Sequence, residues 1–375
     1  MVVRSLKMGG MERVAVNLAD AFAAAGHESH LVSLRQVKRP LAPERADVTL
    51  HHLPLQKRAR KTGIGYVFEL FARLVLNPLV DRSLFLGTGL MGGRVFTSWL
   101  RDFEREHGKV DRIIFRGIGT FELVWSFRDK RARYVLENIF HMKGPSRRRR
   151  LFARCLYHRR DLVAVSQGVA ESIREAQSLW HFRPRSLEVI PNPCPIESIR
   201  RQMLAEEPDL PSVPYIVNVA RLVPAKDQAL LIRAYARSGL MLPLVLVGSG
   251  KQREPLGELA EELGISERVI FAGNRQNPYP WMHHARLFVL SSRFEGMGIV
   301  LFEALACGTP VLSVDCPGGI REILKGELDA CIVRHDEVSL ADGMRKAVAG
   351  DKPETVEEWL DDFRPERIAQ AFLAS

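Results

Sequence analysis

A glutamate stands inside an otherwise apolar segment in the last third of the sequence. Glu303 lies within Ile299–Ala306, where every other residue is apolar. Burying an unpaired carboxylate costs several kcal/mol, so a helix that packs on a sheet would normally carry leucine or alanine at this position. Either Glu303 faces water, as glutamate usually does, or a polar ligand occupies a cleft beside it.

A second carboxylate and a glycine-rich turn precede this segment. Glu295 follows the apolar run 287–290, which we expect to be a strand, and Gly296-Met297-Gly298 leads into the helix that carries Glu303. A helix start offers unpaired N–H groups and the positive end of a dipole, which suit a phosphate, while carboxylates accept hydrogen bonds from hydroxyl groups. The pattern predicts a nucleotide-sugar site; an exposed glutamate on a helix edge is the plain alternative.

Two basic residues lie on an earlier loop between a predicted strand and a predicted helix. Arg221 and Lys226 follow the run 215–219. An arginine can hold two phosphate oxygens and a lysine adds a point charge, so the pair suits a diphosphate. Taken alone, the stretch is better explained by two solvated loop residues. The nearby Gly248-Ser249-Gly250-Lys251 lacks the first glycine and the final hydroxyl of a phosphate-binding loop, and we interpret it as a structural turn.

Short apolar runs alternate with helical stretches through both halves of the chain. This alternation is typical of buried parallel sheets with helices on both faces. The predicted fold class is α/β, with two doubly wound Rossmann-like domains facing across a cleft. Ligands in such sheets sit outside the carboxyl ends of the strands, where the residues above fall. The expected strands are 31–34, 112–115, 134–136, 162–166, 215–219, 244–247, 269–271, 287–290 and 311–314.

Length and composition fit two domains. The chain has 375 residues, of which 46% are hydrophobic and 26% charged. A helix and a proline-containing linker over 198–214 suggest domains at 1–205 and 206–355, with a C-terminal helix in 356–375 that packs back on the first domain. The five cysteines show no CxxC spacing, which favours reduced thiols. We find no signal-peptide core and no apolar stretch of about 18 residues, and we expect a cytoplasmic chain.

The positive charge is concentrated in the first half. Residues 1–205 hold 36 basic and 19 acidic residues, a net charge of +17, while residues 206–375 hold 18 and 25, a net charge of −7, which together give the total of +10. Halves of opposite charge indicate two domains with different partners.

Motifs spread along the chain carry a resemblance to one enzyme family. They are Gly9-Gly10-Met11-Glu12-Arg13, Pro191-Asn192-Pro193, Arg221 with Lys226, the segment 295–311, and Gly318-Gly319-Ile320-Arg321-Glu322-Ile323. Together they resemble retaining GT-B glycosyltransferases of family 4, especially those that build lipopolysaccharide core, O-antigen or capsule. The resemblance covers nearly the whole chain and is most specific over 213–325. It implies an N-terminal acceptor-binding domain and a C-terminal nucleotide-sugar domain.

The resemblance also implies roles for individual residues. Arg221 and Lys226 would neutralise the donor diphosphate, Glu303 would bind the ribose hydroxyls, and Glu295 would act in catalysis by holding hydroxyls of the transferred sugar. The other residues implied in donor binding are Met297, Gly298 and Ile299 through backbone N–H groups, Gly10 through close approach of the backbone, and Asn274 near the base.

The family is metal-independent, which agrees with the residues present. Two basic side chains and a helix start can stabilise a leaving diphosphate as a divalent ion would, and no Asp-x-Asp triplet occurs. We therefore expect a UDP-sugar donor, no cofactor and no metal. Front-face attack, the usual description of this chemistry, lets a donor phosphate oxygen take the acceptor proton and needs no protein nucleophile.

One position departs from the family pattern. Many relatives carry a histidine after the strand that matches Tyr134-Val135-Leu136, whereas this chain has Glu137-Asn138, with His141 shortly afterwards. Either His141 takes the role, as a hydrogen-bond donor to the sugar, or Glu137 replaces it. A solvated loop histidine is an equally good explanation.

The first half also contains basic amphipathic segments. On a helix, the apolar residues at 151, 152, 155 and 156 would share one face surrounded by arginines, and the segment 57–101 adds further basic and apolar groups. Such segments suit an anionic lipid surface or a phosphorylated glycolipid, although a solvated helix packed by one stripe is the simpler explanation. We expect no nucleic-acid partner, because no RNA-binding or finger motif is present.

The sequence thus predicts a retaining transferase of a hexosyl or N-acetylhexosaminyl group from a UDP-sugar to a glycolipid, most of all in lipopolysaccharide core assembly. It would be peripheral on the cytoplasmic face of the inner membrane. One alternative is a family-4 enzyme of O-antigen or capsule assembly that acts on a lipid-diphosphate-linked sugar. Another, from a different class, is a non-catalytic basic protein that binds nucleic acid or anionic surfaces.

Overall fold

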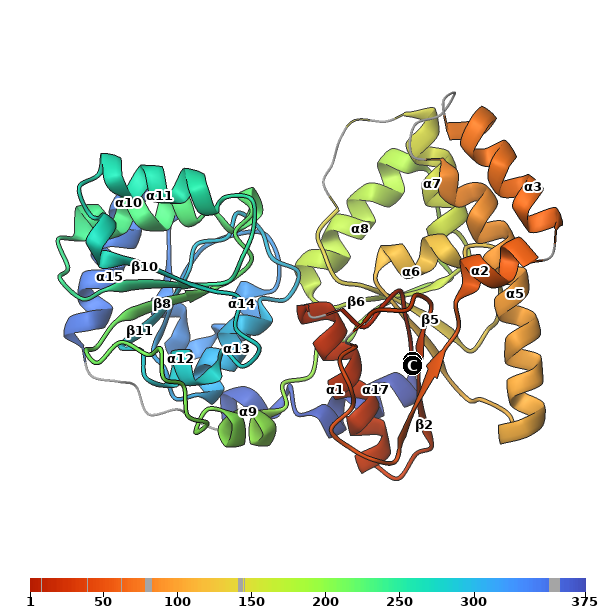
Figure 1. Ribbon diagram of the computed structural model, residues 1–375, viewed down its shortest axis with the longest axis horizontal. Coiled ribbons are helices and arrows are strands. Elements are labelled where there is room, and N and C mark those ends of the chain that lie inside the picture. The colour runs from red at the N-terminus through yellow and green to blue at the C-terminus, as the bar shows by residue number, and fades with distance from the viewer. Residues whose placement is uncertain are drawn as a thin grey trace. The chain divides into compact units, whose positions relative to one another are not determined.

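The chain folds into two compact units, each built on one parallel sheet (Figure 1). Unit 1 consists of Met1–Pro193 with Pro365–Ser375, and unit 2 of Cys194–Arg364. The structure, a computed structural model, describes residues 1–7, 9–38, 40–61, 63–77, 83–140, 144, 146–350 and 358–375. The expected class, α/β with two doubly wound domains, is confirmed for each unit.

Unit 1 contains a seven-stranded sheet in the order β3-β2-β1-β4-β5-β6-β7. Its strands are β1 Val2–Val3, β2 Ser29–Ser33, β3 Val48–His52, β4 Ile113–Arg116, β5 Ala132–Leu136, β6 Asp161–Ala164 and β7 Ser186–Val189. The chain runs to one edge from β1 and to the other from β4, so the topological switch point lies between these two strands. All residues of β4, β5 and β6 are buried because helices cover both faces.

The helices of unit 1 lie on both sides of this sheet. They are α1 Gly10–Ala24, α2 Leu55–Lys61, α3 Ile64–Phe71, the π-helical turn η1 Ala72–Leu76, α5 Leu84–His107, α6 Ile118–Leu123, α7 Arg147–Tyr157, α8 Gln167–Trp180 and α17 Pro365–Ala374. Figure 1 shows α1 and α17 on one side and α6, α7 and α8 on the other. The C-terminal helix α17 buries Ile368 and Phe372, and Arg112 donates hydrogen bonds to the carbonyl oxygens of Phe372 and Leu373 at 3.2 and 2.8 Å.

The helix α5 was not predicted, because its sequence is rich in glycine. Its 24 residues include four glycines on the buried side. A Cβ atom at Gly89 would lie 2.0 Å from the carbonyl oxygen of Glu122, and one at Gly92 would lie 2.1 Å from that of Leu123. These glycines allow the backbone of α6 to lie directly against α5, so tertiary packing outweighs the low helix propensity of glycine.

Unit 2 contains a six-stranded sheet in the order β10-β9-β8-β11-β12-β13. Its strands are β8 Ile216–Val219, β9 Leu244–Val247, β10 Val269–Gly273, β11 Leu287–Leu290, β12 Val311–Val314 and β13 Ile332–Val333. Its helices are α9 Ile196–Gln202, η2 Pro224–Lys226, α10 Gln228–Ser238, α11 Arg253–Glu262, η3 Ser266–Arg268, α12 Tyr279–His283, α13 Ile299–Ala306, α14 Ile320–Ile323, η4 Gly326–Cys331, α15 Glu337–Ala349 and α16 Glu358–Asp361. Figure 1 shows α10 and α11 on one side of the sheet and α12 and α13 on the other.

The helix α9 belongs to unit 2, whereas the sequence suggested that it closes the first domain. It packs against α12 and α13, with Ile196 and Ile199 buried at 4% and 0% exposure. Asn277 donates a hydrogen bond to the carbonyl oxygen of Gln202 at the end of this helix at 2.8 Å. The division therefore falls at Pro193–Cys194, because the apolar face of α9 is covered by unit 2.

Candidate active site

The switch point of the second sheet lies between β8 and β11, which are neighbours. The loop after β8 carries Arg221 and Lys226, and the loop after β11 carries Glu295. Arg293 N donates a hydrogen bond to the carbonyl oxygen of Ala225 at 2.9 Å, so the two loops are joined directly. Ligands of doubly wound sheets bind outside the strands at this point.

An ion pair is the chemical centre of these two loops. Nζ of Lys226 lies 2.5 Å from Oε1 of Glu295, and Ser292 Oγ donates to the same oxygen at 2.6 Å. The Glu295 residue is 8% exposed. Within the part of the chain that the structure describes, its second oxygen, Oε2, accepts no hydrogen bond. A buried carboxylate with one oxygen held and the other available can receive a ligand hydroxyl at a fixed position.

Arg221 lies on the same loop as Lys226 but faces solvent. Its backbone is fixed, because its carbonyl oxygen accepts hydrogen bonds from Val223 N at 2.9 Å and from Gln228 Nε2 at 3.1 Å. Its guanidinium has no ion-pair partner among the residues that the structure describes. A cation on an anchored backbone, next to a second cation on the same loop, is suited to an anionic ligand.

The helix α13 begins beside this pair through a tight glycine turn. Gly298 has φ of 86°, a conformation that side chains disfavour, and a Cβ atom there would lie 2.8 Å from Cδ1 of Ile320. Met297 is buried at 2% exposure and Ile299 is the first residue of the helix. The turn is closed by Gly318, whose Cβ would lie 2.0 Å from the carbonyl oxygen of Glu295. The free N–H groups of the first turn thus start close to the carboxylate.

Glu303 is half-buried within α13. Oη of Tyr279, a buried residue of α12, donates a hydrogen bond to its Oε1 at 3.2 Å. Burial raises the pKa of the Cys307 thiol, and the nearby Glu303 charge raises it further; the pKa of Cys194 is raised by the same two causes. The apolar neighbours therefore tolerate the carboxylate because a tyrosine holds it. Tyr279 was not among the site residues predicted from the sequence.

Asn274 follows the end of β10 and is exposed. Its neighbour Arg275 is fully engaged: it lies 5.0 Å from the Trp281 ring centroid and pairs with Asp209 at 2.6 Å and Glu207 at 3.4 Å. The residue at 275 is thus part of the structural frame of this edge, and Asn274 is the more accessible group.

The glycines at 248 and 250 form a structural turn, as predicted. A Cβ atom at Gly248 would lie 1.9 Å from the carbonyl oxygen of Ala220, and one at Gly250 would lie 2.1 Å from that of Leu222. Both glycines let the loop after β9 press against the loop that carries Arg221. Their role is to position that loop.

In unit 1, the predicted site residues Gly10 and Glu137 follow strands of the first sheet, but neither resembles the ion pair of unit 2. Gly10 starts α1 and would accept a Cβ without any contact within 4 Å. Glu137 is held by the buried Arg116, whose Nε donates to it at 2.7 Å, and by Asn192, whose Nδ2 donates at 3.3 Å. Arg116 also donates to Asn192 Oδ1. Glu137 is therefore committed to a closed internal network, and His141 lies outside the described residues.

The basic helix expected near residue 150 is present as α7, but its packing differs from the prediction. The buried residues are Ala153, Leu156 and Tyr157, whereas Leu151 is 46% exposed. The buried stripe is shifted because Tyr157 packs against Phe140 and Phe182, at centroid distances of 5.3 and 5.4 Å.

Comparison with known proteins identifies the class of this protein. Residues 201–359 match the family model described as glycosyl transferases group 1. The chain is 28% identical over 355 residues, 93% of its length and 90% of the relative's, to the N-acetylgalactosamine-N,N'-diacetylbacillosaminyl-diphospho-undecaprenol 4-alpha-N-acetylgalactosaminyltransferase of Campylobacter jejuni. The chain is a glycosyltransferase.

Two further comparisons extend this result. The glycosyltransferase is 29% identical over 221 residues to the lipopolysaccharide core biosynthesis glycosyltransferase LpsE of Rhizobium meliloti, an alignment that covers 56% of this chain and 62% of that relative. Its fold matches the crystal structure of WaaG, a glycosyltransferase involved in lipopolysaccharide biosynthesis, with a TM-score of 0.61 at 19% identity over the full length of both chains. The GT-B fold is therefore shown.

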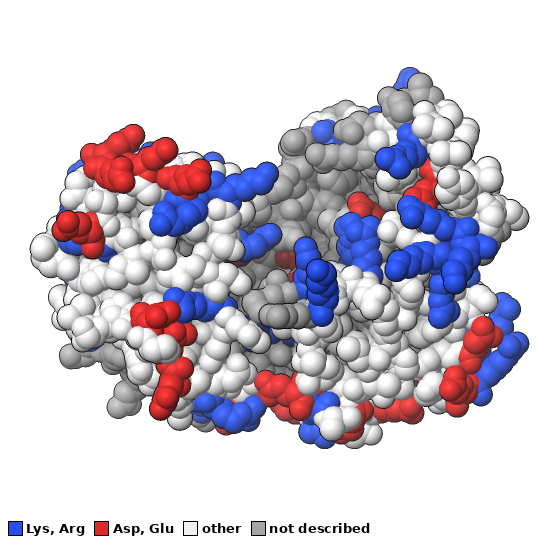
Figure 2. All heavy atoms as spheres, viewed as in Figure 1, with Lys and Arg blue, Asp and Glu red and all other residues white. Residues whose placement is uncertain are grey.

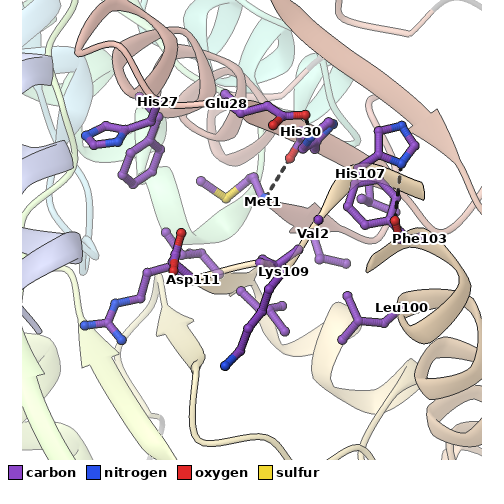
Figure 3. Close-up of a pocket in the computed structure, with 18 of the residues that line it drawn as sticks. Met1, Val2, His27, Glu28, His30, Leu100, Phe103, His107, Lys109 and Asp111 are labelled. Carbon is purple, nitrogen blue, oxygen red and sulfur yellow. Dashed lines mark hydrogen bonds and ion pairs between the residues drawn. The ribbon is translucent and has the colours of Figure 1, made fainter. Parts of the chain in front are cut away.

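Unit 1 of the glycosyltransferase also has a cavity of about 210 Å³, which lies at the amino ends of its strands (Figure 3). It is lined by residues that start β1, β2 and β4 and by the end of α5, including His30 and His107. Burial lowers the pKa of His30, and Figure 3 shows its carbonyl oxygen accepting a hydrogen bond from the Met1 amine at 2.7 Å. The cavity lies at the amino ends of these strands, within unit 1, whereas the residues of the candidate site described above belong to unit 2. No helix in the described part of the chain is long and apolar enough to cross a membrane.

Proposed function

We propose that this glycosyltransferase moves a hexosyl or N-acetylhexosaminyl group from a UDP-sugar to a glycolipid acceptor, with retention at the anomeric carbon. The observation that carries the proposal is the Lys226–Glu295 ion pair at the switch point of the second sheet, at 2.5 Å. A lysine suits a diphosphate and a carboxylate suits hydroxyl groups, and here the two side chains are in direct contact.

The donor diphosphate would lie against Arg221, Lys226 and the start of α13. Two cations and the N–H groups of a helix start offset the charge that develops on a leaving diphosphate. This set can replace a divalent ion, and we propose that transfer needs none. Addition of a chelator should then leave the rate of transfer unchanged.

The sugar and ribose would be held by the two carboxylates. Oε2 of Glu295 is available to accept a hydrogen bond from a hydroxyl of the transferred sugar, while Oε1 remains with Lys226 and Ser292. Glu303, fixed by Tyr279, would accept hydrogen bonds from the ribose, with the base near Asn274. Each charge-assisted hydrogen bond of this kind contributes about 1.5–3 kcal/mol.

Retention is proposed to follow front-face attack. The acceptor hydroxyl would approach the side from which the diphosphate leaves, and a donor phosphate oxygen would take its proton. By this route, catalysis depends mainly on stabilising the charge that develops on the leaving diphosphate. The alpha linkage in the name of the Campylobacter jejuni relative supports it.

The acceptor is proposed to carry phosphate. A groove follows the carboxyl ends of β2 and β3, and its lining includes three cations, Arg35, Lys38 and Lys57. Lipopolysaccharide core is one candidate acceptor, as the name of LpsE suggests. A lipid-diphosphate-linked sugar is the second, favoured by the relative that aligns over 93% of the chain. Either acceptor would bring the enzyme to the cytoplasmic face of the inner membrane.

The direct test is a donor screen with purified protein. UDP-, GDP- and ADP-linked sugars would be supplied with either a short lipid-diphosphate-linked sugar or a deacylated lipopolysaccharide core, and nucleoside diphosphate release would be measured. We expect release from a UDP-sugar that depends on one acceptor. Release from a GDP- or ADP-sugar alone would overturn the proposed donor, and no acceptor-dependent release from any donor would overturn the proposed reaction.

A further inference from the structure

The helix α3 and the turn η1 present large apolar side chains to the outside of unit 1. We call these side chains the α3–η1 surface. Their exposed fractions run from 39% to 64%, and they are Ile64, Tyr66, Val67, Phe68, Leu70, Phe71, Leu74 and Val75. An apolar patch of this density on one short segment marks an interaction site rather than ordinary surface.

Small residues form the inner face of the same segment. Gly65 and Ala72 are buried, whereas the large apolar side chains of the same segment are exposed. A Cβ atom at Gly87 of α5 would lie 2.7 Å from Cβ of Ala72 and 3.1 Å from the carbonyl oxygen of Phe68. The segment is thus seated closely on α5 by its small residues. An ordinary amphipathic helix does the opposite and buries its large apolar side chains.

Basic side chains lie beside the α3–η1 surface. Residues 55–76 carry five basic residues, Lys57, Arg58, Arg60, Lys61 and Arg73, against one acidic residue, Glu69, which is ion-paired with Arg60. Figure 2 shows the outer surface of α3 nearly free of charge, with lysine and arginine gathered over the adjacent α2. The helix α7, with Arg147–Arg150, is joined to the start of α5 by the Phe85–Phe152 ring contact at 4.8 Å.

We propose that the α3–η1 surface inserts into the interfacial region of an anionic lipid bilayer. Apolar side chains enter the acyl boundary while the surrounding cations contact lipid headgroups, as in membrane-surface helices. The segment is too short to span a bilayer, which needs about 20 residues. The proposal rests in part on the proposed function, because a glycolipid acceptor is itself held in a membrane, and it assigns the contact to one named surface.

The charge on the surface argues against a second copy of the chain as the occupant. Two copies that met through this surface would bring the cations of both α2 helices together, and like charges across an interface disfavour association. An anionic bilayer instead neutralises these charges while it covers the apolar side chains.

The test is the co-sedimentation of the full chain with vesicles of phosphatidylcholine and phosphatidylglycerol. The double variant Val67→Glu/Leu74→Glu changes two side chains that are 63% and 64% exposed, and Leu204→Glu, at 71% exposure in unit 2, is the matched control. We expect the partition coefficient of the double variant to fall at least tenfold and that of the control to stay within twofold of the unchanged chain. In 0.5 M salt the unchanged chain should keep part of its binding, because the apolar contribution is not screened.

Three results would overturn the proposal: equal binding by the double variant, complete loss of binding in salt, or a dimer in ultracentrifugation that the double variant abolishes. Circular dichroism and UDP release in detergent with a short-chain acceptor serve as folding and activity controls. A chain that binds vesicles through this surface but releases no UDP would contradict only the proposed function.

Discussion

Glu295 illustrates how much of the site depends on single atoms. One of its oxygens receives Lys226 and Ser292, and the other has no partner in the described part of the chain. The ion pair fixes the carboxylate, so the available oxygen points to one position. A side chain of the same shape without the charge would keep the shape of the site and lose its strongest hydrogen bonds.

We therefore predict that Glu295→Gln lowers kcat about 10–100-fold while the Kd for UDP changes less than threefold. The substitution removes a charge-assisted hydrogen bond that contributes about 1.5–3 kcal/mol. That bond is made to the transferred sugar, which UDP lacks. Initial rates and calorimetric titration with UDP measure the two quantities. The exposed Glu261 of α11 offers a matched control in Glu261→Gln. Equal losses in rate and UDP affinity would contradict the assignment.

Glu137 has a different task from Glu295, although both are acidic residues at a strand end. Its carboxylate is bound by Arg116 and Asn192, and Arg116 is 0% exposed. We predict that Glu137→Gln destabilises the chain by about 3–5 kcal/mol, because it leaves Arg116 buried without its counter-charge.

Urea unfolding of unit 1 checks this value, with Glu171→Gln on the exposed surface of α8 as control. A variant as stable as the unchanged chain, but slower in transfer, would instead show that Glu137 acts on the substrate.

At the scale of elements, the start of α13 is where we propose that the donor phosphate binds. Gly298 holds a positive φ and lies under Ile320. We predict that Gly298→Ala costs about 1–2 kcal/mol of stability from the backbone conformation alone, and that it weakens UDP binding because the helix start must shift.

Thermal unfolding and UDP titration measure both effects, and Gly257→Ala within α11, where a Cβ meets only the far end of Arg253, is the control. If Gly298→Ala bound UDP like the unchanged chain, the helix start would not contact the diphosphate.

The elements of unit 2 could be predicted from the sequence more fully than those of unit 1. Strands such as 287–290 are short and wholly apolar, and the loops at their carboxyl ends carry the charged residues of the site. In unit 1, α3 exposes its large apolar residues and α5 buries glycines, so neither follows the usual periodicity. Tyr279 and Arg116 escaped prediction because their partners, Glu303 and Asn192, are distant in the chain.

At the scale of the whole molecule, the C-terminal helix completes the unit that the N-terminal half begins. The helix α17 packs on α1 and places Ile368 and Phe372 in the core of unit 1. We predict that a chain ending at Arg364 loses at least about 3 kcal/mol of stability in unit 1, since each buried apolar side chain contributes about 1.5–3 kcal/mol.

Urea unfolding monitored by fluorescence tests this expectation, together with thermal unfolding measured by calorimetry. The control is Gln370→Ala, an exposed position on the same helix. Unfolding of the shortened chain at the same urea concentration as the full chain would show that α17 is dispensable to unit 1.

The central claim is that a carboxylate inside an apolar helix binds the hydroxyls of a sugar nucleotide. Calorimetric titration of UDP into the unchanged chain, Glu303→Gln and Glu261→Gln tests it most directly. The account predicts saturable binding by the unchanged chain and by Glu261→Gln, and binding about 10–100-fold weaker by Glu303→Gln. Equal affinity in all three proteins, or no UDP binding by any of them, would contradict it.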